Sequence, residues 1–240
     1  MFRKVEAKKE ELFAERPFSE MFLRTVAARN LLDFAFMNLK LEGSKLTEQG
    51  VSSILRGEIV PGVSIGEHNL AGYHRDALAL FDEMRRMKTD LDRKELARIY
   101  EVIWHVQAPS YRVAGKVLYH LDYVAPVHMQ PAEMLDELFR YQYKREETYK
   151  GDYILRAVEL HDGIIGVYPY EEGSELLARC ALTYELLRHE LPVVGIGLRE
   201  PEYNEAVSLA LNKGDHRRLY EAVCRAALKK LDYLIELARA

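Results

Sequence analysis

Residues 161–179 read HDGIIGVYPYEEGSELLAR, and this stretch is the most informative one in the 240-residue chain. Apolar residues up to Val167 recur at helical spacing, and a second helical pattern starts at about residue 173. Pro169 and Gly173 lie between the two patterns, and both residue types favour turns. We therefore expect two helices, at about 152–167 and about 173–190, joined by a short turn.

The same periodicity extends over most of the chain. It predicts further helices at about 17–40, 47–56, 65–88, 92–107, 131–147, 201–212 and 216–238. Residues 111–127 differ, because Val117, Tyr119, Leu121 and Tyr123 alternate with other residues as in a strand. We predict an all-α fold with a small β-hairpin at residues 111–127.

Composition and charge exclude several classes of protein. A net charge of −4 with interspersed signs gives no basic patch for nucleic acid or for a membrane surface. The first residues are too charged for a secretory leader, and the apolar run Leu191–Leu198 is too short to span a bilayer. Cys180 and Cys224 have no metal-binding spacing, so they are expected to be buried thiols in a reducing compartment. We expect a cytoplasmic protein.

The stretch YPYEEGSELLAR at residues 168–179 resembles the motif HPFxDGNGRxxR of the Fic (Fic/Doc) family. Pro169, the aromatic Tyr170, the acidic Glu172, Gly173 and the final Arg179 match this motif. The other positions differ: Tyr168 replaces the histidine, Ser174 the asparagine, Glu175 the second glycine and Leu176 the first arginine.

Other segments resemble the same family in the expected order. NLKLEGSKLT at residues 38–47 is similar to its inhibitory element [ST]xxxE[GN], with Glu42 and Gly43 matching and Asn38 in place of Ser or Thr. Arg112, the predicted hairpin (the flap of the family) and Pro131 follow. The resemblance covers about residues 38–225 and implies a Fic-like helical domain. Residues 1–37 would then be a helical extension, and residues 226–240 the end of the last helix.

The resemblance implies transfer of AMP from ATP to a target hydroxyl, with the motif histidine as general base. A phenol, with an ordinary pKa of about 10, is a poor substitute, so Tyr168 is either a doubtful catalytic residue or a packing residue. Gly173, Ser174 and Arg179 would be the remnant of a nucleotide site, and Glu172 a candidate Mg²⁺ ligand or an ordinary helix cap. ATP and Mg²⁺ are expected as cofactors only if the site is active.

Two changes work against phosphate binding. The side chain of Glu175 would crowd the backbone nest at the helix N-terminus and add a repelling charge. Leu176 removes an arginine that would hold the phosphates.

Arg179 has two candidate carboxylate partners. The resemblance implies an inhibitory ion pair with the regulatory Glu42, whereas helix geometry allows a pair with Glu175, four residues earlier. Either pair could be purely structural. The histidines, His120 among them, show no metal-ligand spacing and are interpreted as surface or packing residues.

Two hypotheses for the function remain. The first is a degenerate Fic-like protein that binds or regulates a partner, and the second is a divergent nucleotidyl or phosphate-group transferase. In either case Val117, Tyr119 and Leu121 of the flap are expected to present one face to a protein partner, unless the hairpin only packs on the helices. The sequence predicts neither the partner nor the oligomeric state.

Overall fold

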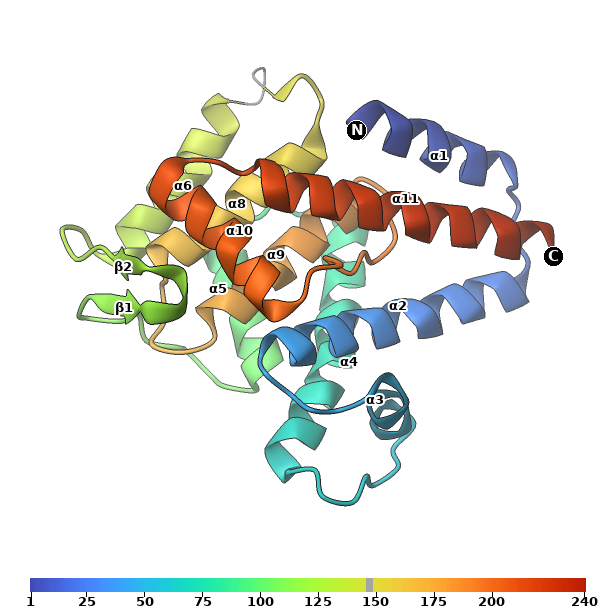
Figure 1. Cartoon of the computed structure of the whole chain (residues 1–240), viewed down its shortest axis with the longest axis horizontal. Coiled ribbons are helices and arrows are strands. Elements are labelled where there is room, and N and C mark those ends of the chain that lie inside the picture. The colour runs from blue at the N-terminus through green and yellow to red at the C-terminus, as the bar shows by residue number, and fades with distance from the viewer. Residues whose placement is uncertain (146–148) are drawn as a thin grey trace.

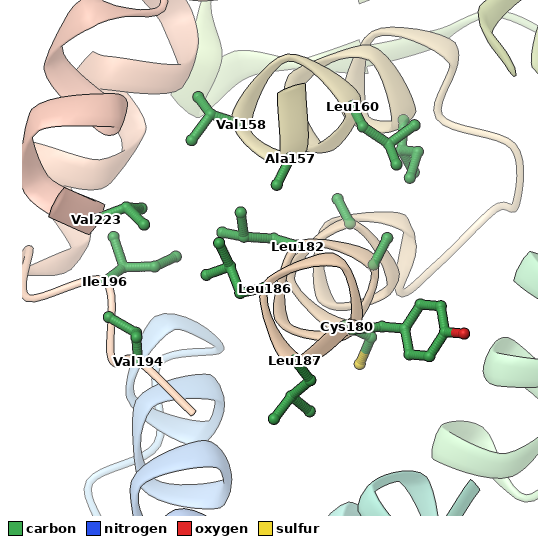
Figure 2. Close-up of a cluster of buried hydrophobic side chains, with 14 of the residues drawn as sticks. Ala157, Val158, Leu160, Cys180, Leu182, Leu186, Leu187, Val194, Ile196 and Val223 are labelled. Carbon is green, nitrogen blue, oxygen red and sulfur yellow. The ribbon is translucent and has the colours of Figure 1, made fainter. Parts of the chain in front are cut away.

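Helix α9, Ser174–Arg188, is the central element of the fold. The computed structural model describes residues 1–145 and 149–240. Within α9, the side chains from Leu176 to Leu187 are buried. Helix α8, Tyr153–Val167, packs along α9, and Figure 2 shows its Ala157 and Leu160 facing the α9 side chains. The strongest sequence feature thus forms the core of the molecule.

The other helices surround this pair (Figure 1). They are α1 (Phe2–Ala14), α2 (Glu20–Leu41), α3 (Glu48–Leu55), α4 (Ile65–Arg86), α5 (Arg93–Trp104), α6 (Pro131–Lys144), α10 (Glu200–Lys213) and α11 (Arg217–Arg239). Several begin at a residue whose side chain accepts a hydrogen bond from a backbone N–H of the first turn. Ser19, Thr47, Ser64, Asp92 and Asp152 cap α2, α3, α4, α5 and α8 in this way.

The all-α prediction with one small hairpin is confirmed. The predicted helices agree with the structure to within about three residues. Helix α2 begins at Glu20 and not at about residue 17, and α5 was predicted to end near residue 107. This helix ends at Trp104 because His105 adopts a left-handed conformation with φ of 51°. The predicted end of α6 at residue 147 lies outside the described residues.

The hairpin is shorter than predicted. Strands β1, Lys116–Leu118, and β2, Tyr123–Ala125, are antiparallel, with Val117 opposite Val124. A 3₁₀ turn, η1 (Tyr119–Leu121), connects them.

The prediction that Val117, Tyr119, Leu121 and Tyr123 share one face is wrong. The 3₁₀ turn breaks the period of two, so that Tyr119 is 88% exposed whereas Leu121 is only 1% exposed. The exposed apolar face consists of Val117, Tyr119 and Val124.

Both expected divisions of the chain fall within helices. Residue 37 lies inside α2 and residue 225 inside α11. Helix α1 packs on α11 (Figure 1), so that the N-terminal segment contacts the last helix. No helix in the two described ranges combines the length and the apolar character needed to cross a membrane.

Candidate functional site at the α8–α9 turn

The turn between α8 and α9 has one residue with a left-handed backbone conformation at each end. Tyr168 ends α8 with φ of 46°, and Gly173 precedes α9 with φ of 71°. A Cβ atom at Gly173 would lie 2.2 Å from Nε1 of Trp104. Glycine is therefore required at this position for two reasons: the backbone conformation and the indole ring packed against it.

Tyr168, at the position of the motif histidine, is buried. Its side chain is 7% exposed, and burial together with the charges of Glu175 and Glu42 raises the pKa of the phenol. A raised pKa keeps the hydroxyl protonated at neutral pH. Tyr168 can donate a hydrogen bond here, but it cannot readily accept a proton.

Arg112 joins the turn to the base of the flap. Its side chain is buried, and its Nε donates to the carbonyl of Tyr168 at 2.7 Å. Nη2 donates to the carbonyls of Val167 at 2.9 Å and Pro126 at 2.6 Å, and Nη1 donates to that of Ala114 at 2.6 Å. One guanidinium therefore satisfies carbonyl groups at the end of α8 and on both sides of the flap.

Ser174 and Tyr170 close the turn by local hydrogen bonds. The Ser174 hydroxyl accepts from the backbone N–H of Tyr170 at 3.0 Å and donates to its carbonyl at 3.1 Å. The Tyr170 ring stacks on Tyr111, with centroids 5.3 Å apart, and also contacts Tyr100. Ser174 is completely buried, so that its hydroxyl serves the turn itself.

Glu172, the candidate Mg²⁺ ligand, has an exposed side chain. Only its carbonyl makes a described contact, accepting a hydrogen bond from the Tyr100 hydroxyl at 3.1 Å. Across residues 1–145 and 149–240, no three or more His, Cys, Asp or Glu side chains are grouped so that they could hold a metal ion.

Glu175 lies in the first turn of α9 and contacts the flap. Its Oε1 is 3.0 Å from Nε2 of His120, in the turn between the two strands. The Glu175 side chain is 19% exposed and that of His120 is 44% exposed, so the pair is partly accessible to solvent. The sequence predicts that His120 is a surface or packing residue, and it does not predict this contact. No local pattern could identify this partner, which lies 55 positions away in the chain.

Arg179 pairs with Glu42 and not with Glu175. Its Nη2 donates to Glu42, at the C-terminus of α2, and its Nε donates to Oδ1 of the buried Asn38 at 2.9 Å. The guanidinium of Arg179 is fully buried and also faces the ring of Tyr203, 5.7 Å from the centroid. Asn38 and Glu42 both belong to the segment that resembles the inhibitory element. Both thus accept hydrogen bonds from Arg179, the last arginine of the motif.

A hydrogen-bonded chain of buried groups continues from Tyr203. Its hydroxyl contacts Nε2 of His161 at 2.8 Å, and Nδ1 of His161 contacts Asp162 at 2.8 Å. The other oxygen of Asp162 is 2.7 Å from Nδ1 of His216, which is partly exposed. No sequence pattern predicts this network, because its members come from α8, from α10 and from the residue that precedes α11.

A cavity of about 610 Å³ lies beside the turn, between the flap and α10. His120 and Asp122 line it on the flap side, and Asn204, Ser208 and Asn212 on the α10 side. Because His120 also contacts Glu175, the cavity adjoins the first turn of α9. Tyr119, Leu121 and Leu209 also line it, so that its surface combines polar and apolar groups.

Comparison with solved structures identifies the fold. A Fic domain containing signaling protein from Bacteroides thetaiotaomicron superimposes with a TM-score of 0.84 at 14% identity, over 98% of this chain and 97% of the other. Fic-1 from C. elegans (aa134 - 508) gives a TM-score of 0.81 at 21% identity, over 99% of this chain and 73% of the other. A Fic family protein from Desulfovibrio desulfuricans gives 0.75 at 14% identity, over 100% and 75% of the two chains.

The chain therefore has the fold of Fic domain proteins, as the sequence resemblance implied. No protein-family model and no curated protein matches the sequence itself. The likeness is one of structure, at identities that establish the fold alone.

Proposed function

We propose that this chain is a Fic-like protein that does not transfer AMP and that serves as a binding or regulatory module. The observation that carries the proposal is the position of Glu175. Its carboxylate lies in the first turn of α9, where the motif resemblance expects a glycine and a phosphate group. Two negative charges about 4 Å apart repel by about 4 kcal/mol at an effective dielectric constant near 20. Even a third of this energy lowers the affinity about tenfold.

The other motif positions support the same proposal. Tyr168 is buried and its pKa is raised, which is the opposite of what a general base needs. Leu176 is buried and offers no charge to a phosphate. Arg179 donates hydrogen bonds to Glu42 and Asn38 and points toward α2. The described residues therefore fit Mg²⁺ and ATP poorly.

Calorimetric titration with ATP and Mg²⁺ tests this proposal. We expect either no heat or a dissociation constant in the millimolar range, which corresponds to about −4 kcal/mol. A micromolar dissociation constant would overturn the proposal.

The flap is the proposed docking surface for a protein partner. Val117 and Val124 lie opposite each other and are 47% and 60% exposed, and Tyr119 extends this apolar face. The two strands also present unpaired backbone groups, to which an extended segment of a partner could add as a strand.

A photo-crosslinking residue in place of Tyr119 tests flap docking. Exposed to light in a cell extract, it should give a discrete adduct, whereas the same residue in place of Tyr141, 52% exposed on α6, should not. The adduct should disappear when Val117 and Val124 are both replaced by aspartate. Equal adducts at Tyr119 and Tyr141 would contradict docking at the flap.

A divergent transferase is the second candidate function, and the His120–Glu175 pair favours it. A histidine oriented by a carboxylate is a common general base, and this one borders the cavity between the flap and α10. His120 would then replace Tyr168 as the base. If labelled phosphate or nucleotide from any nucleoside triphosphate is incorporated into the protein or a target, His120→Ala should abolish the incorporation and Tyr168→Phe should not. No incorporation from any nucleoside triphosphate would exclude this candidate.

A further inference from the structure

A second, larger groove lies away from the motif, between α2 and α11. Its volume is about 1010 Å³, and residues Gly195–Glu200 close one side of it. Helices α2 and α11 run in opposite directions along the groove (Figure 1). None of the residues that line it belongs to the α8–α9 turn or to the flap.

The walls of the groove are long and straight. Residues of α2 from Arg29 to Leu41 form one wall, and residues of α11 from Ala222 to Tyr233 form the other. Each wall covers about three helical turns, or about 17 Å at 1.5 Å per residue. This length corresponds to a helix of about three turns better than to a compact small molecule.

The floor of the groove is apolar. Phe36, Met37 and Leu41 contribute from α2, and Ala222 and Ala226 from α11. The small alanine side chains leave room for larger apolar residues of an incoming helix. A helix with apolar side chains at positions i, i+3, i+4 and i+7 would fit such a floor.

The rim of the groove is basic, although the chain as a whole carries a net charge of −4. Six cationic residues but only two acidic residues line the groove, and these are Arg29, Lys40, Arg199, Arg225, Lys229 and Lys230 against Asp33 and Glu200. Four of these six have carboxylate partners: Arg29 and Lys230 pair with Asp33, Arg199 with Glu202 and Arg225 with Glu221. Within the described part of the chain, Lys40 and Lys229 have no carboxylate within ion-pairing distance. Nζ of Lys40 donates one hydrogen bond to the carbonyl of Ser44 at 3.2 Å, and that bond leaves its charge without a carboxylate. These two lysines, one on each wall, can therefore each pair with a carboxylate of an acidic ligand.

We propose that the groove binds an acidic amphipathic helix of a partner polypeptide. The apolar face of this helix would lie on the floor, and its carboxylates would face Lys40 and Lys229. Charge complementarity of this kind selects the partner and increases the rate of association.

Fluorescence anisotropy with a labelled synthetic peptide tests the proposal. The peptide has about 14 residues, so that it extends about 21 Å as a helix, with leucine on one face and glutamate on the other. We expect it to bind at least tenfold more tightly than the same peptide with lysine in place of glutamate. The Lys40→Glu/Lys229→Glu protein should bind the acidic peptide at least tenfold more weakly than the unchanged protein.

The matched control is Lys4→Glu/Lys94→Glu, which changes the net charge equally at exposed positions on α1 and α5. This variant should bind the acidic peptide within about twofold of the unchanged protein, because distant surface charges are screened at physiological salt. Thermal unfolding of both variants verifies that they are folded. No binding of the acidic peptide, or an equal loss in both variants, would overturn the proposal. A labelled single-stranded oligonucleotide that binds in its place and is lost in Lys40→Glu/Lys229→Glu would also overturn it, because the groove would then be a nucleic-acid site.

Discussion

Glu42 and Arg179 form an ion pair across 137 positions of the chain, and the two side chains differ greatly in exposure. The arginine is fully buried at the centre of the fold, whereas the glutamate is 30% exposed at the end of α2. The pair therefore ties α2 to the core helix at the edge of the candidate site. Because the Glu175 carboxylate contacts His120, it cannot replace Glu42 as the ion-pair partner of Arg179.

Replacing Glu42 by glycine should destabilise the protein and should not release AMP transfer. Loss of the carboxylate leaves the buried Arg179 without a charged partner, beside Asn38 and Tyr203, which should cost about 3 kcal/mol of unfolding free energy. Chemical denaturation measures this cost, and labelled ATP tests for autoadenylylation.

Arg179→Met, added to Glu42→Gly in the same chain, should restore part of the stability. The control Glu58→Gly removes an exposed pair with Arg56 and should shift the unfolding midpoint much less. Autoadenylylation in Glu42→Gly would refute the proposed loss of activity.

Replacing Glu175 by glycine should strengthen binding of ATP with Mg²⁺. The substitution removes the negative charge from the first turn of α9 and opens the backbone N–H groups to a phosphate. We expect the dissociation constant to fall about tenfold, which corresponds to about 1.4 kcal/mol. Glu171→Gly, which removes an exposed carboxylate from the same turn, is the control and should have a smaller effect. Equal affinities in both variants would show that Glu175 is not what excludes the phosphate.

Replacing Arg112 by lysine should destabilise the flap. Lysine has a single nitrogen, which cannot replace the three guanidinium nitrogens that bond carbonyl groups of the flap and of α8. Leaving some of these buried acceptors unsatisfied should cost about 3 kcal/mol. Urea unfolding measures the loss, and hydrogen exchange should show the largest gain in rate at β1 and β2. Arg199→Lys at an exposed position should leave both measurements nearly unchanged.

His74 should make the protein less stable in mild acid. It is fully buried in α4, and burial lowers its pKa from 6.5 to about 4. The unfolded chain takes up a proton as the pH falls below about 6.5, whereas the folded chain does not until about pH 4. The contribution of His74 to stability is therefore complete above pH 6.5 and is lost as the pH falls toward 4.

The loss should reach about 3 kcal/mol, since each pKa unit corresponds to about 1.36 kcal/mol. Unfolding free energies measured between neutral pH and pH 4 should fall less in His74→Leu than in the unchanged protein. His128→Leu removes an exposed histidine and serves as the control. Identical pH profiles for the unchanged protein and His74→Leu would show that His74 is not the source of the acid sensitivity.

The sequence by itself determined the helices and the type of fold. Apolar spacing placed α2, α8 and α9 to within a few residues, because helical periodicity and capping residues such as Ser19 act within a few positions of the chain. The motif and the inhibitory element also indicated the Fic fold. Their order along the chain was enough to suggest Glu42 as a partner for Arg179, but helix spacing offered Glu175 equally.

Only the tertiary structure decided between these partners. Glu175 and Arg179 have the right separation on one helix, yet Glu175 turns to His120 of the flap, while Arg179 faces α2 and the buried Asn38. The same holds for the flap, where a 3₁₀ turn buries Leu121 and exposes Tyr119. Local patterns carry no information on which distant element lies opposite a side chain. That choice depends on how α2, the flap and α9 pack together, and packing fixes both the partners of the charged groups and the faces left open to solvent.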